Sequence, residues 1–143
     1  MSGAVAVEVL RLLQQQLLVA AIAQTPLPGQ GDVLRFPDLA LLLERPERIV
    51  SRENLAEGVD PGIAVVFLSD AEITERVKRA GDLPALGFRP VEKLDDGHIR
   101  LTLELRMYFV DVEPLPLGAI IATFAEVPGG GWQVADRPAA LGY

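Results

Sequence analysis

Asp111 is the polar residue whose position in the sequence most suggests chemistry. Apolar residues alternate with polar ones through Ile99–Phe109, and counting by two from Ile99 places Asp111, and then Glu113, on the apolar side. A carboxylate at the rim of an apolar concavity is a stronger base than one in water, so it can act as a general base. The simpler interpretation, which we favour, is that the strand ends near Pro114 and both acids face water.

The other residues that could do chemistry are weaker candidates. His98 is the single histidine, and it directly follows Asp96-Gly97 in a predicted turn, so we expect a solvated side chain rather than a catalytic base. The Gly129–Gly131 run lies between two predicted strands, which favours a hairpin turn over a phosphate-binding loop. Without cysteine, a second histidine or a complete glycine-rich fingerprint, the sequence predicts neither a metal site nor a cofactor.

The charge of the chain restricts its partners. Its 143 residues have a formal net charge of −7, and the 13 Lys and Arg residues are interleaved with acids. Binding to a phosphate backbone needs a basic stripe, so we expect no nucleic-acid partner. On the predicted helix Asp70–Ala80, Glu72 and Glu75 stand four residues before Arg76 and Arg79, a spacing that predicts neutralising ion pairs.

The apolar segment Ala4–Ala23 resembles a signal peptide or a membrane span only at first sight. No positive residue precedes it, and Glu8, Arg11 and a run of glutamines interrupt it. A bilayer span needs about 20 largely uncharged residues, and a signal peptide needs a basic start. We therefore expect a cytoplasmic protein that does not associate with membranes.

The same segment predicts a long helix, Ala4–Gln24, that is apolar around most of its circumference. Its polar residues form one narrow stripe, whereas a helix lying on a sheet normally has a broad polar half. Either the predicted short helix Leu39–Leu43 or a second subunit must cover the excess. We expect a homodimer, and the candidate interface residues to one side of the stripe are Leu10, Leu13 and Leu17.

The rest of the chain predicts one α+β domain over residues 1–143. A buried strand, Gly62–Leu68, precedes a capping box formed by Ser69 and Glu72. After them the pattern predicts a curved antiparallel β-meander of about four strands, packed on the N-terminal helices. Its strands are Phe88–Leu94, Ile99–Val112, Ala119–Val127 and Trp132–Asp136. This order of elements resembles the cystatin-like or nuclear-transport-factor-like cone, a family that ranges from small-molecule isomerases to binding subunits.

Two classes of function follow. The first is a small non-catalytic interaction or binding module that acts as a homodimer with an unidentified protein partner. The second is a cofactor-free protein that binds a small apolar ligand, or an isomerase- or hydrolase-like enzyme, with Asp111 as its pocket carboxylate. Large side chains on the inner face of the long strand favour the first class, because a pocket needs space.

Overall fold

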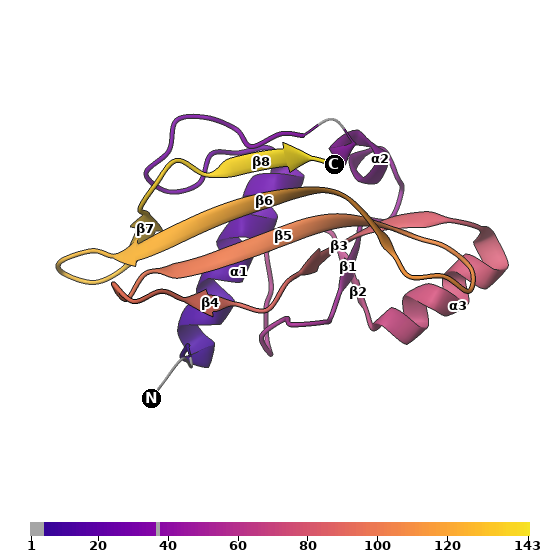
Figure 1. Ribbon diagram of the computed structural model, residues 1–143, viewed down its shortest axis with the longest axis horizontal. Helices are drawn as coiled ribbons and strands as arrows, with labels where there is room; N and C mark the ends of the chain where they lie inside the picture. Colours follow the sequence, from indigo (N-terminus) through magenta and orange to yellow (C-terminus); the bar gives the residue numbers. More distant parts are fainter. Residues whose placement is uncertain (1–4, 37) are drawn as a thin grey trace.

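The computed structural model describes residues 5–36 and 38–143, which form an α+β fold around an open sheet (Figure 1). The strands follow the order β2-β1-β3-β5-β6-β7, with β4 beside β5 and β8 beside β6, so the sheet has eight strands. The helices are α1 (Val7–Ala23), α2 (Leu39–Leu43) and α3 (Asp70–Ala80). The strands are β1 (Ile49–Ser51), β2 (Val66–Leu68), β3 (Leu83–Phe88), β4 (Glu92–Lys93), β5 (Ile99–Tyr108), β6 (Leu115–Glu126), β7 (Trp132–Val134) and β8 (Ala139–Gly142).

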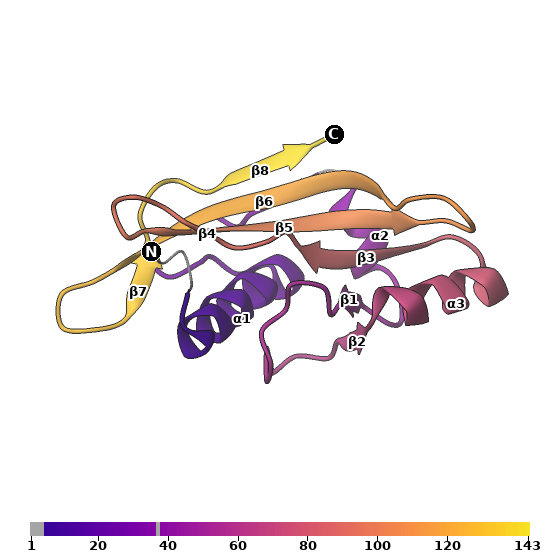
Figure 2. The same ribbon diagram turned by 60° about the horizontal axis from the view of Figure 1, so that its bottom comes forward.

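Strand β5 lies at the centre of the core, as its alternating sequence predicts. From Ile99 to Leu105 every second side chain is at most 3% exposed and packs in the cluster that contains α1, which lies beneath β5 in Figure 2. The opposite face is only partly wet, because Glu104 and Tyr108 are also buried. The expectation of a sheet covered on one side therefore holds for the first half of β5 alone.

The sheet is mixed, so the expectation of an antiparallel meander of about four strands is not confirmed for the sheet as a whole. Strand β1 pairs in parallel with both β2 and β3, whereas β3, β5, β6 and β7 are antiparallel neighbours. Parallel strands need a crossover connection, which α3 supplies between β2 and β3. The capping box that starts α3 is confirmed, with Ser69 Oγ accepting from the Glu72 N–H at 3.1 Å. This βαβ arrangement is the reason that the resemblance to a cystatin-like cone is not confirmed.

Helices α1 and α3 pack on opposite faces of the sheet. Leu86 and Phe88 of β3 belong to the core cluster that contains α1. Leu83 and Ala85, which have the other strand parity, belong to a second cluster with the buried side chains of α3. Helix α3 thus covers part of the sheet face that the sequence pattern predicts to be exposed to solvent.

Helix α1 is covered mainly by its own chain, which bears on the predicted interface residues. Leu13 and Leu17 are fully buried in the single chain, and Leu10 is half-buried against the same core. They therefore offer little or no surface to a second copy. Of the large apolar residues of α1, only Val7 and Leu12 are exposed, and no helix of the described residues is long and apolar enough to cross a bilayer.

The polar stripe of α1 forms hydrogen bonds with a loop of the same chain instead of facing solvent. Gln14 is 1% exposed, and its side chain donates to the Asn54 carbonyl and accepts from the Ala56 N–H, both at 2.8 Å. Gln15 accepts from the Asp60 N–H at 2.9 Å. Residues 52–61 therefore lie along the stripe. The narrow polar face of α1 is thus occupied by hydrogen bonds to a loop of the same chain.

The hairpin between β4 and β5 differs from its predicted register by one residue. The turn closes between Leu94 and His98, where the Leu94 N–H donates to the His98 carbonyl at 2.8 Å. Three residues rather than two therefore form the loop, with Gly97 at a φ of 85°, a common arrangement for a glycine in the last loop position. The shift places Glu92 rather than Lys93 opposite Arg100, so like charges no longer face each other.

Candidate functional site

The structure places Asp111 and Glu113 in an exposed turn, residues 109–114, between β5 and β6. Strand β5 ends at Tyr108, and Asp111 adopts a left-handed φ of 59°, so the alternation does not extend to it. An open hollow of about 470 Å³ lies between this turn and Thr74 of α3. The hypothesis that Asp111 acts as a general base requires a carboxylate at the rim of an apolar concavity. In the structure the Asp111 side chain is exposed instead.

His98 lies in the exposed hairpin turn that the sequence predicts. Its Nδ1 is 3.2 Å from Oδ2 of Asp96, and its N–H is capped by the same carboxylate at 2.9 Å. This is a local turn interaction rather than a nucleophile–base pair. Across residues 5–36 and 38–143, no group of three or more His, Asp or Glu side chains is arranged to hold a metal ion.

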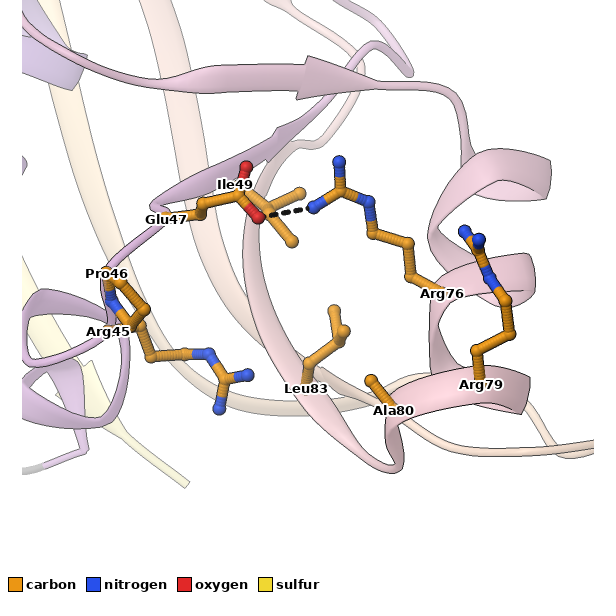
Figure 3. Close-up of a pocket in the computed structure, with 8 residues that line it drawn as sticks. All are labelled: Arg45, Pro46, Glu47, Ile49, Arg76, Arg79, Ala80 and Leu83. Carbon is orange, nitrogen blue, oxygen red and sulfur yellow. Dashed lines mark hydrogen bonds and ion pairs between the residues drawn. The ribbon is translucent and has the colours of Figure 1, made fainter.

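Three arginines surround a hollow of about 450 Å³ between α3 and the connection from α2 to β1 (Figure 3). Arg45 extends from the connection, whereas Arg76 and Arg79 come from one flank of α3, three residues apart. We call this site the arginine hollow. Apolar surface in its lining comes from Pro46, Ile49, Ala80 and Leu83.

Only one of these arginines has a carboxylate partner. Nη1 of Arg76 is 2.7 Å from Oε1 of Glu47, an ion pair that spans the hollow in Figure 3. Within the part of the chain that the structure describes, neither Arg45 nor Arg79 forms an ion pair. The lining therefore holds three positive charges against one negative charge, on a chain whose formal net charge is −7.

The ion pairs predicted along α3 do not form, and both of its arginines instead border the hollow, where Arg76 pairs with Glu47. Glu72 accepts from the Ser69 N–H at 2.9 Å in the capping box, and Glu75 lies 3.7 Å from Lys78. The spacing of Arg76 and Arg79 could have indicated a basic flank. Nothing in the sequence indicated Arg45, because its approach to α3 depends on β1 lying between β2 and β3.

A second polar cluster lies on the α3 face of the sheet. Asp70 Oδ1 accepts from Ser51 Oγ at 2.6 Å and from the Tyr108 hydroxyl at 3.2 Å. Beside it, Arg106 Nε donates to the buried carboxylate of Glu104 at 3.0 Å. These bonds connect β1, α3 and β5. The adjoining cavity is about 230 Å³, smaller than the 300–1,000 Å³ typical of ligand sites, so we assign the cluster a structural role.

The titration of this cluster is set by a carboxyl pair. A hydrogen bond to Asp70, followed by burial, raises the pKa of Glu53 above the ordinary glutamate value. Burial works to raise the pKa of Asp70, but hydrogen bonds from Ser51, Glu53 and Tyr108 outweigh it and hold that pKa below its ordinary value. Of the two carboxyl groups, Glu53 is therefore the one that holds a proton more readily than an ordinary side chain of its type, and Asp70 the one that ionises more readily.

Glu53→Gln is expected to change how stability depends on pH. Because folding raises the pKa of Glu53, its contribution is complete below the ordinary value of 4.5 and is lost as pH rises through the folded value. A glutamine can donate to Asp70 at every pH. Relative to the natural protein, the variant should gain stability between pH 4 and pH 7, by less than about 1 kcal/mol because Glu53 is exposed.

Urea melts at both pH values measure this difference. Asp70→Asn is the matched background, because it removes the charge that faces Glu53. In that background Glu53→Gln should no longer gain stability with rising pH. The same gain with and without Asp70 would show that the two carboxyl groups are not coupled.

No family model matches the sequence, and no solved structure matches the fold significantly. The structure itself shows an α+β protein with a mixed open sheet and a helix packed on each face.

Proposed function

We propose that the protein is a non-catalytic interaction module whose arginine hollow binds an acidic, partly apolar segment of a partner protein. The observation that carries this proposal is a pair of guanidinium groups, those of Arg45 and Arg79, that have no counter-ion among the described residues and border a hollow with apolar lining. Arginine forks bind carboxylates through two parallel hydrogen bonds. The side chain of Arg76 is already oriented by Glu47, which reduces the entropy lost on binding.

The lining also restricts the shape of the bound segment. Aliphatic surface from Pro46 and Ala80 lies beside the charged groups, so a carboxylate next to a short aliphatic side chain matches both. A volume of about 450 Å³ admits a few side chains rather than a whole helix. The natural ligand is therefore a turn or an extended segment with acidic and aliphatic residues next to each other.

Titration with a short peptide tests the proposal. The probe is the acetylated, amidated pentapeptide Leu-Glu-Val-Asp-Leu, and its Gln/Asn analogue is the neutral control. We expect amide shifts in NMR spectra to map to residues 45–49 and 76–83. The double variant Arg45→Ala/Arg79→Ala should weaken binding about tenfold or more, since charge-assisted hydrogen bonds contribute about 1.5–3 kcal/mol each.

Arg137→Ala is a control for the loss of a positive charge elsewhere on the surface, because Arg137 is exposed and lies beside Asp32, outside the hollow. This variant should bind the peptide as the natural protein does. Equal binding of the acidic and neutral peptides, or equal losses in the two arginine variants, would contradict a specific site.

The alternative class, a protein with a small-ligand pocket and Asp111 as its base, has less support. The hollow beside Asp111 is open and is formed largely by the exposed turn itself. A site for an apolar ligand normally buries most of the ligand surface. The exposed position of Asp111 suits contact with another protein better than proton transfer.

We also propose a cytoplasmic location, which rests on the interruption of the N-terminal apolar segment by Glu8 and Arg11. These charges lie within α1, and Arg11 Nε donates to the Glu57 carbonyl at 2.8 Å. The segment is thus used by the fold itself. Fractionation of cells that express the tagged chain would test the location, and recovery in a membrane or secreted fraction would contradict it.

A further inference from the structure

We infer that the segment bound in the arginine hollow is the β5–β6 turn of a second copy, so that two chains form a closed homodimer through two reciprocal contacts. This inference rests on the proposed function, because it names the occupant of the same hollow. It also places the expected homodimer on a surface other than α1.

The β5–β6 turn, residues 109–114, has the chemistry that the hollow selects. Val110 is 44% exposed and Val112 is 63% exposed, and they alternate with the exposed carboxylates of Asp111 and Glu113. No ion pair of either carboxylate occurs within residues 5–36 and 38–143. Two carboxylates beside exposed valines on one surface therefore complement two guanidinium groups beside apolar lining on the other.

The position of α3 allows the contacts to be reciprocal. Thr74 borders the hollow beside the turn, whereas Arg76 and Arg79 border the arginine hollow. At 100° per residue these arginines lie about 200° and 140° around the helix from Thr74, so turn and hollow lie on different flanks of α3. Figure 2 shows the turn and α3 at the same end of the molecule. This arrangement is compatible with a two-fold axis near α3 that brings each turn against the partner's hollow.

The dimer is expected to be weak and specific. Each contact involves one turn and one small hollow, so the interface consists of two separate small contacts rather than one large continuous one. Two chains with a formal net charge of −7 also repel each other. We expect a dissociation constant on the order of 10 µM. Sedimentation of the natural chain from about 1 to 200 µM should therefore pass from monomer to dimer.

Charge exchange between the two surfaces tests the inference. Variant one, Arg45→Glu/Arg79→Glu, makes the hollow acidic. Variant two, Asp111→Asn/Glu113→Lys, makes the turn basic and keeps at position 111 a residue that tolerates a positive φ. All four residues are exposed, so both variants should fold, which circular dichroism melts would check. Each variant alone should remain monomeric, and their equimolar mixture should form a dimer with one copy of each.

The mixture distinguishes loss of the interface from loss of folding. Two unfolded variants would not associate when mixed, whereas two folded variants with complementary surfaces would form a dimer. A natural chain that stays monomeric to 200 µM, or a mixture that does not dimerise, would overturn the inference. If the chain is monomeric but the acidic pentapeptide still binds at Arg45 and Arg79, the proposed function stands and only the occupant is wrong. If neither association occurs, both proposals fail.

Discussion

Replacing Leu103 with alanine is expected to lower the free energy of unfolding by about 2–5 kcal/mol, as truncation of a fully buried leucine does. Leu103 has no exposed surface and lies in the middle of β5. Phe88 of β3 and Ile120 of β6 are its partners across the sheet, and both are also fully buried. Strands on both sides hold these neighbours in place, so they cannot close the cavity that the truncation leaves.

The adjacent position gives the matched control. Thr102 is half-buried on the opposite face of β5, and Thr102→Ala should cost about 0.5 kcal/mol or less. Urea melts of both variants, with the same dependence of the unfolding free energy on urea concentration, measure the difference in stability. Equal losses at the two positions would show that both faces of this half of the sheet are covered.

How far the sequence predicts this fold depends on element length. Ten residues of β5 provide several repeats of the two-residue period, so its buried face could be recognised directly. Strand β1 has only three residues, Ile49–Ser51, and all three are buried, so it has no alternation to detect. Because β1 is the strand that pairs in parallel with β2 and β3, the mixed character of the sheet could not be predicted.

The second half of β5 illustrates the same limit on a single strand. Glu104 and Tyr108 have the parity of the predicted wet face, yet they are 6% and 3% exposed. Tyr108 packs in the cluster that contains the crossover helix α3 and donates to Asp70 at the start of that helix. Glu104 instead pairs with Arg106 and Arg89. A local period describes which residues share a face, but the burial of that face depends on an element elsewhere in the chain.

The candidate site was accessible to sequence reasoning only in part. Asp111 and Glu113 could be singled out by counting along a strand, but the strand ends before them. Arg76 and Arg79 share a flank of a predicted helix, and their predicted partners Glu72 and Glu75 turned out to be engaged elsewhere. A hollow assembled from a helix and a distant loop is a product of tertiary structure, which no local pattern contains.

Replacing Gln14 with alanine is expected to lower the free energy of unfolding by about 2–4 kcal/mol. Its amide is buried and makes two hydrogen bonds, with the Asn54 carbonyl and the Ala56 N–H. Alanine would leave both partly buried backbone groups without a partner, and each such group costs about 1–3 kcal/mol. The loop of residues 52–61 should then separate from α1, and the Ala56 amide should lose its protection from hydrogen exchange.

Gln15→Ala is the control on the same stripe, because Gln15 makes one exposed hydrogen bond, with the Asp60 N–H. It should cost less than about 1 kcal/mol and leave the exchange of Ala56 unchanged. If Gln14→Ala were no worse than Gln15→Ala, the loop would not depend on α1. The narrow polar stripe would then require another explanation, and a subunit contact along α1, the first expectation from the sequence, would again be the natural one.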